Sequence, residues 1–290
     1  MIKKLVVIGV GLIGGSFALA LKKAGAVKHV VGMGRSQKNL RLALQLGVID
    51  EVADDYATAV EGADMVFIGT PVGQMPSIMR AIASHLNQRT VITDGGSTKQ
   101  DVIQCAKDCL GEHFVRFVPA HPMAGAEHSG AAAAKVDLYH GRKVILVPQP
   151  KTSVRAVAKV RAAWLACGAK VVRLKAREHD EILAAVSHLP HVVAFSLMGH
   201  LAQHKNPKRL LGFSAGGLRD TVRIAGSSPE MWRDIFLANQ VALLGELDAY
   251  AEELQVMRRA LKKKDGATLL SLFEKARRAR ERWIVPPARQ

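Results

Sequence analysis

The chain has 290 residues, of which 49% are hydrophobic and 23% are charged, so a packed soluble core is expected. The net charge of +16 is compatible with binding to nucleic acid or to acidic small molecules. Three cysteines are too few for a disulfide framework, and their spacing indicates no metal site. No run reaches the roughly 18 uninterrupted apolar residues of a membrane span, and the apolar N-terminus lacks a signal-peptide cleavage pattern. These features predict a cytoplasmic protein with no metal and no membrane segment.

The first 174 residues alternate short apolar runs with helical patterns. The runs predict strands at 4–10, 28–33, 64–69, 89–94, 114–118, 143–148 and 169–174. Nearly continuous apolar strands are typical of a parallel sheet that is covered on both faces. The pattern therefore predicts an α/β fold in which residues 1–174 form a doubly wound parallel sheet of the Rossmann type.

Residues 175–290 have a different pattern, with no convincing strand. Helices are predicted at 178–203, 229–263 and 266–282, and a segment rich in glycine and arginine, 212–228, separates them. Their long apolar stripes exceed what a small domain of this length buries by itself. We therefore expect an all-helical second domain that forms a homodimer.

A glycine motif joins the first strand to the first helix. Gly9, Gly11 and Gly14 form G-x-G-x-x-G, with Leu12 and Ile13 between the last two glycines. The first glycine permits a tight turn, the second permits close approach of a pyrophosphate, and the third permits close packing of helix on strand. These residues are predicted to bind a dinucleotide.

Further cofactor contacts are expected where the next strands end, because ligands of open α/β sheets bind at the carboxyl ends of the strands. Thr70 and Pro71 follow the strand at 64–69, and Asp94 ends the strand at 89–94. The second strand leads into Gly34, Arg35 and Ser36, where NAD-dependent enzymes usually carry a carboxylate for the ribose. Since Arg35 suits a 2′-phosphate, NADP is favoured over NAD, and NAD stays open.

Several motifs lie near these strand ends and in the helical half: GLIGGS (11–16), DGGSTK (94–99), HPMAGAEHSG (121–130), SHLPH (187–191) and GGLRDTVRIAGSSPEMW (216–232). At these residues, and in this order over most of its length, the chain resembles the prephenate and arogenate dehydrogenases. The resemblance implies a Rossmann domain followed by a helical dimerisation domain. It also implies oxidative decarboxylation of prephenate, arogenate or both, in tyrosine biosynthesis.

The resemblance implies a catalytic pair. The substrate is a cyclohexadienol that loses a hydride from its hydroxyl-bearing carbon and then loses its ring carboxylate as CO₂. His121 matches the family's catalytic histidine, and a neutral imidazole suits removal of the hydroxyl proton. Ser97 matches a serine that hydrogen-bonds the same hydroxyl, and it also suits a helix N-cap.

The resemblance also implies a set of substrate contacts. Arg223 and His191 match the residues that hold the substrate carboxylates. His188 is expected beside them in a more structural role, and Glu127 and Asp220 are expected to orient cations near the mouth of the site.

Two other classes of protein share part of this pattern. A β-hydroxyacid dehydrogenase also joins a Rossmann domain to helices, but that class relies on a lysine in the interdomain helix, and residues 178–200 contain none. A nucleic-acid-binding or redox-sensing regulator on a Rossmann fold would explain the net charge, but no helix-turn-helix or zinc spacing accompanies it. We therefore expect no nucleic-acid partner.

Overall fold

The computed structural model describes residues 1–125 and 129–284. The chain divides into compact units, Met1–Gln240 and Val241–Gln290, and each is described by itself. The predicted domain boundary at residue 174 falls inside the first unit, directly after a strand, and it stays a prediction.

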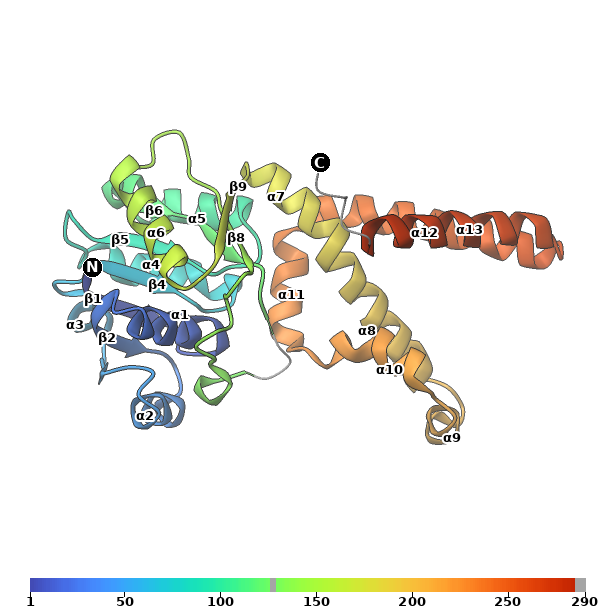
Figure 1. The fold of residues 1–290 in the computed structure, drawn as a ribbon, viewed down its shortest axis with the longest axis horizontal. Coiled ribbons are helices and arrows are strands. Elements are labelled where there is room, and N and C mark those ends of the chain that lie inside the picture. Colours follow the sequence, from blue (N-terminus) through green and yellow to red (C-terminus); the bar gives the residue numbers. More distant parts are fainter. Residues whose placement is uncertain (126–128, 285–290) are drawn as a thin grey trace. The chain divides into compact units, whose positions relative to one another are not determined.

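The first unit contains a parallel sheet (Figure 1). Its strands are β1 (Ile2–Ile8), β2 (Val27–Met33), β3 (Glu51–Val52), β4 (Met65–Ile68), β5 (Val91–Asp94) and β6 (Phe117–Val118). They lie in the order β3-β2-β1-β4-β5-β6, and every neighbouring pair is parallel. The order reverses between β1 and β4, which is where a doubly wound sheet binds its ligand. The predicted Rossmann-type fold is confirmed.

Alternate side chains of β1 belong to separate apolar clusters, because successive residues of a strand face opposite sides of the sheet. Leu5 and Val7 pack with α1 (Leu12–Lys23), α2 (Gln37–Gln45) and α6 (Val154–Ala166). Val6 and Ile8 pack with the other cluster, whose helices are α3 (Tyr56–Val60), α4 (Met75–Ala83) and α5 (Gln100–Cys109). The sheet is thus buried on both faces, as the apolar strands predict.

The strands predicted at 143–148 and 169–174 do not extend this sheet, and that expectation is wrong. A separate sheet contains β7 (Ala120–Pro122), β8 (Lys143–Leu146) and β9 (Lys170–Arg173), and β7 runs antiparallel to β8. The change of sheet occurs at Pro119, which lies between β6 and β7 and has no backbone N–H to continue the ladder. Short 3-10 turns η1 (Val72–Gln74), η2 (Gly111–Arg116) and η3 (Ala131–Ala133) complete this part of the chain.

The predicted helix at 178–203 is an unbroken helical stretch with a change of winding in the middle. It comprises α7 (Ala176–Leu183), a π-helical turn η4 (Ala184–His188) and α8 (Leu189–Ala202). π-helical turns occur frequently at functional sites. This stretch is long and apolar enough to cross a membrane, judged by length and composition only. The prediction of no membrane segment therefore stays a prediction. In the same stretch, His179 and Asp180 are buried polar residues.

The helix predicted at 229–263 is interrupted at Asn239, so the prediction of one continuous helix is wrong. The segment before it contains α9 (Pro207–Gly212), α10 (Gly216–Val222), η5 (Arg223–Gly226) and α11 (Pro229–Ala238). Asn239 is buried, and its side chain is hydrogen-bonded to other parts of the first unit, so it leaves the helical path. α12 (Gln240–Lys262) then leads through a turn at Lys264, where φ is +51°, into α13 (Gly266–Ile284). Among the described residues, 175–284 contain helices and no strand, as predicted.

Candidate active site

The glycine turn after β1 has a shape that only glycine permits. Gly9 has a φ of +94°, and a Cβ there would lie 2.8 Å from Thr70 Cγ2. A Cβ at Gly14 would lie 2.4 Å from the carbonyl oxygen of Gly9. By contrast, the nearest described atom to a Cβ built on Gly11 is 4.0 Å away, so the outer side of the turn is accessible. Helix and strand are thus in close contact, while space is left beside Gly11.

The start of α1 is suited to an anion. Gly11 is its N-cap, no side chain among the described residues caps it, and its first turn contains no acidic residue. The backbone N–H groups near Leu12 and Ile13 and the helix dipole therefore favour a negative group. This turn is compatible with the pyrophosphate of a dinucleotide, and the binding roles of these residues stay a prediction.

The end of β2 lacks a carboxylate for a ribose. Gly34 follows the strand, and Arg35 and Ser36 are exposed. The Ser36 hydroxyl accepts a hydrogen bond of 3.2 Å from the Asn39 backbone N–H and so caps α2. The first turn of α2 also contains no acidic residue. The surroundings are compatible with a phosphate on the ribose.

The predicted contacts after β4 and β5 differ in accessibility. Thr70 and Pro71 are partly exposed beside the glycine turn, and Thr70 Oγ1 is buried without a partner among the described residues. Asp94 is fully buried. Its carboxylate accepts hydrogen bonds from the backbone N–H groups of Gly96 (2.8 Å) and Ala120 (3.0 Å) and pairs with the ammonium of Lys99. We therefore interpret Asp94 as a structural anchor instead of a side chain that contacts the cofactor.

The anchor brings the predicted catalytic pair together. Asp94 fixes the amide next to Ser97 on one side and the amide next to His121 on the other. The same loop reaches the cofactor turn, since a Cβ at Gly95 would lie 2.9 Å from Ile13 Cγ2. Ser97, His121 and the start of α1 thus belong to one neighbourhood at the carboxyl ends of the strands.

His121 is the first member of a buried chain of hydrogen bonds. Its Nδ1 lies 2.8 Å from Nε2 of His179, and Nδ1 of His179 lies 2.7 Å from Oδ1 of Asp180. The Asp180 carboxylate also accepts the backbone N–H groups of Lys99 (2.9 Å) and Gln100 (2.8 Å) at the start of α5. These hydrogen bonds connect β7, α7 and α5, which are distant in sequence.

These groups have shifted pKa values. Burial lowers the pKa of His121 well below its usual value, and the charges of His179 and Lys99 act in the same direction. Burial also lowers the pKa of His179, against the opposing effect of its hydrogen bond to Asp180. Burial raises the pKa of Asp180, but hydrogen bonds from His179 and from backbone N–H groups outweigh that effect, and its net pKa is lowered. The carboxylate is thus ionised and both rings are neutral at neutral pH.

His188 lies in the π-helical turn and is almost fully buried. The side-chain nitrogen of Asn239 donates to the carbonyl of Asp180 (2.8 Å) and lies 3.1 Å from Nδ1 of His188. Because that nitrogen is a donor, His188 carries its proton on Nε2, which has no partner among the described residues. Burial lowers the pKa of His188 to about 4. This arrangement favours the structural role expected for it.

The predicted carboxylate contacts lie in the helices that follow. His191 is partly buried and stacks on Trp232, with ring centroids 3.5 Å apart. Its Nδ1 donates to the carbonyl of Ser187 at 2.9 Å. Arg223 is exposed at the start of η5. The pKa of His191 is lowered mainly by burial of its ring, and the charge of Arg223 lowers it further. The two predicted anchors are therefore near each other.

The remaining predicted contacts are less informative. Asp220 is exposed on α10. Glu127 lies outside the described residues.

Sequence reasoning missed His179, Asp180, Asn239 and Trp232. A usable signal existed for the first two: His179 precedes Leu183 by four residues, and Asp180 precedes Ala184 by four, so helical spacing places them on the buried face. Their partners lie 58 and 81 residues away in sequence, and no local pattern identifies such partners.

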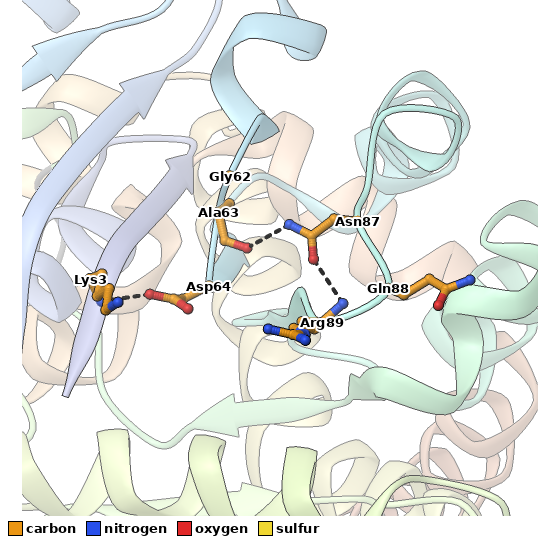
Figure 2. A pocket seen from close by; sticks show the side chains of 7 residues that line it. All are labelled: Lys3, Gly62, Ala63, Asp64, Asn87, Gln88 and Arg89. Carbon is orange, nitrogen blue, oxygen red and sulfur yellow. Dashed lines mark hydrogen bonds between the residues drawn. The ribbon is translucent and has the colours of Figure 1, made fainter.

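A pocket of about 440 Å³ lies at the opposite end of the sheet, where the strands begin (Figure 2). The side chains of Asp64 and Asn87 in its lining are engaged in structural contacts. The Asp64 carboxylate accepts the backbone N–H groups of Lys3 (2.6 Å) and Lys4 (3.2 Å), and Asn87 Oδ1 accepts that of Arg89 (2.7 Å). None of the predicted site residues lines it, so we do not interpret it as the reaction site.

Comparison with known proteins agrees with this geometry. Residues 17–173 match the family model of the prephenate dehydrogenase nucleotide-binding domain, and residues 175–275 match that of the prephenate dehydrogenase dimerization domain. The glycine turn at 9–14 precedes the first match, so its assignment rests on its geometry. These matches favour the resemblance stated above over the two alternatives.

Similar proteins span nearly the whole chain. A prephenate dehydrogenase from Bacillus subtilis is 40% identical over 94% of this chain and 74% of its own length. A cyclohexadienyl dehydrogenase from Zymomonas mobilis is 37% identical over 96% of this chain and 95% of its own length. The crystal structure of prephenate dehydrogenase from A. aeolicus with hydroxyphenyl propionate and NAD+ has a TM-score of 0.90 and 31% identity, over 97% of this chain and 98% of that one. The chain belongs to the prephenate dehydrogenase family.

Proposed function

We propose that this chain oxidises and decarboxylates prephenate, that His121 is its general base, and that NADP⁺ is its preferred hydride acceptor. Arogenate is the alternative substrate, because it differs from prephenate only in the side chain, away from the carbon that loses hydride. The observation that carries the proposal is the neutral, buried His121 beside the loop that reaches the cofactor turn. A cytoplasmic location, with no nucleic-acid or membrane partner, stays a prediction.

The mechanism follows from what His121 can do. When bound, the nicotinamide supplies the hydride acceptor. As the hydride leaves, the substrate hydroxyl becomes acidic, and the imidazole of His121 accepts its proton. Loss of CO₂ from the ring carbon leaves its bonding electrons in an aromatic phenolate. The protonated His121 then returns the proton to the phenolate oxygen, so the enzyme ends in its starting protonation state.

The substrate carboxylates need cationic partners. Arg223 offers two parallel N–H donors to a carboxylate. His191 donates its Nδ1 proton to the Ser187 carbonyl, so its Nε2 can donate to a carboxylate only when the ring is protonated. We propose that Arg223 is the main anchor, that His191 assists it, and that Ser97 orients the reacting hydroxyl. Roles for Asp220 and Glu127 in orienting these cations stay predictions.

The preference for NADP⁺ is supported by the residues after β2. A 2′-phosphate placed there would meet the exposed Arg35 and the start of α2, and no carboxylate of that turn would repel it. We propose that Arg35 reads this phosphate.

A homodimer is supported by exposed apolar side chains in the helical part. In the first unit, α8 is largely apolar; of its residues only Ala194 is buried, and most of its other apolar side chains are partly exposed. In the second unit, Val241 is 89% exposed, Leu261 64% and Phe273 56%. Apolar helix surface of this extent is typical of an interface between subunits.

The first prediction concerns catalysis. We expect the wild type to convert prephenate to a phenol with release of CO₂, and His121→Asn to lower kcat by about 10²–10⁴-fold with a smaller change in KM. Because low pH protonates the base and its pKa is well below the usual value of about 6.5, the wild-type kcat should fall only at a pH well below that value, and that limb should vanish in the variant. Steady-state kinetics with prephenate and arogenate, each with NAD⁺ and NADP⁺, measures both effects. A variant with normal kcat and an unchanged acid limb would refute the assignment.

The second prediction concerns the cofactor. Arg35→Ala should raise KM for NADP⁺ by about tenfold or more, because a charge-assisted hydrogen bond is worth roughly 1.5–3 kcal/mol, and should leave KM for NAD⁺ nearly unchanged. Arg89→Ala, which removes an arginine at the opposite end of the sheet, is the matched control (Figure 2). Equal losses with both cofactors would show that Arg35 does not read the 2′-phosphate.

The third prediction concerns assembly. Light scattering should give twice the chain mass of 31.3 kDa at micromolar concentration. Val241→Glu should shift the protein toward the monomer, whereas Leu44→Glu, on the 44% exposed Leu44 of α2, should not. A wild-type monomer would contradict the dimer.

A further inference from the structure

The Asp180 carboxylate determines which nitrogen of His179 carries a proton. An ionised carboxylate only accepts hydrogen bonds. Oδ1 of Asp180 accepts the Lys99 backbone N–H and faces Nδ1 of His179, while Oδ2 accepts the Gln100 backbone N–H. His179 must therefore donate from Nδ1. A neutral imidazole has one N–H, so Nε2 of His179 is an acceptor.

The same reasoning extends to His121. Its Nδ1 lies 2.8 Å from the accepting Nε2 of His179, so Nδ1 of His121 is the donor. The lone pair of His121 then lies on Nε2, on the side of the ring away from His179. A base needs that lone pair, and the opposite tautomer would present an N–H to the substrate hydroxyl instead.

We infer that His179 and Asp180 are positioning residues that hold His121 in the Nδ1–H tautomer, with Nε2 free to accept the substrate proton. The inference rests on the proposal that His121 is the base. The bonds from Asp180 to the backbone amides of Lys99 and Gln100 are enough to hold α7 against the start of α5, and we call these two bonds the clamp. The fully buried His179 adds nothing to that clamp, but it transmits the polarity of the carboxylate to His121.

The arrangement also suits the charged form of His121. Once His121 accepts the substrate proton, its Nδ1–H still donates to His179, and the negative carboxylate lies one ring away. The nearby ammonium of Lys99 is paired with Asp94, which moderates its repulsion. Electrostatic support from a fixed negative group lowers the cost of forming an imidazolium.

Asp180→Asn changes the group that faces His179, and it also removes one of the two bonds to the backbone amides. The amide has one acceptor oxygen where the carboxylate has two. If that oxygen accepts from Gln100 N–H, the amide nitrogen faces His179 and donates to its Nδ1. His179 would then donate from Nε2 to Nδ1 of His121, and His121 would carry its proton on Nε2, the tautomer that cannot act as a base.

We expect Asp180→Asn to lower kcat by about 10²–10⁴-fold, since a comparable change of tautomer in the Ser–His–Asp triad costs roughly 10⁴-fold. KM values for substrate and cofactor should change by less than about threefold, because the Asp180 side chain is buried and bonded to His179 and to backbone amides. A distant control is Asp64→Asn at the other end of the sheet, where one oxygen, Oδ2, accepts both backbone N–H groups. It should leave kcat unchanged.

A second pair of variants covers the case in which Asp180→Asn does not fold. His179→Gln keeps an acceptor oxygen near the position of Nε2, whereas His179→Phe removes it. We expect His179→Gln to retain more than about tenfold higher kcat than His179→Phe. Equal kcat values in the two variants would overturn the inference.

Nitrogen NMR of protein with labelled histidine reads the tautomer directly and needs no substrate. Wild type should show His121 protonated on Nδ1, and Asp180→Asn should show it protonated on Nε2. Turnover of prephenate by a wild type protonated on Nε2, or an Asp180→Asn enzyme that shows His121 protonated on Nε2 and yet keeps a near-normal kcat, would overturn the inference. A wild type with the expected tautomer but no turnover would instead contradict the proposed function, so the two failures are distinguishable.

Discussion

Two buried carboxylates hold Lys99 between them, and the geometry of the site depends on this arrangement. Asp94 pairs with the ammonium of Lys99, while Asp180 accepts its backbone N–H. Through these groups, the end of β5, the amide before His121 and the start of α7 are fixed relative to one another. Removing one partner of a buried ion pair costs about 3–5 kcal/mol, because the other charge is left uncompensated. The buried ion pair and the hydrogen bonds around it therefore fix the positions of the segments that carry His121 and His179.

Burial of the histidines gives the site its electrostatic character. Burial is the main cause that lowers the pKa values of His121, His179 and His188. Below about pH 6.5 the unfolded chain would protonate such rings while the folded chain does not, so acidification favours unfolding in that range. The lowered pKa of Asp180 acts in the same direction at still lower pH, because the unfolded chain protonates that carboxyl first. A site that keeps its base neutral thus loses stability in acid.

Much of the fold could be predicted from the sequence because its signals are local. The apolar run around residues 4–10 and the glycine motif specify β1, the turn and α1 within one stretch of chain. The antiparallel β7 was not predictable, since it has three residues and its partner β8 begins 22 positions after His121 on the chain, across a stretch with no strand pattern. The break at Asn239 was missed because helical spacing continues on both sides of it.

The candidate site shows the same division between local and distant signals. His121 and Ser97 lie in motifs and could be identified directly. His179 and Asp180 lie in the segment AREHDEIL, whose charged residues are typical of a solvated helix face; their spacing from Leu183 and Ala184 indicates the buried face, but the partners that they bond are distant in sequence. Asp94 was expected to contact the cofactor because it ends a strand, but its carboxylate is fully used by Gly96, Ala120 and Lys99.

The most direct test of this account is a crystal structure of the chain with NADP⁺ and a phenolic analogue of the product. The account predicts that the phenol oxygen lies within hydrogen-bond distance of His121 Nε2, roughly 2.6–3.2 Å, while Nδ1 of the same ring stays on His179. A phenol oxygen bound to His188 or His191, with His121 turned away from it, would contradict the central claim and make one of those residues the candidate base.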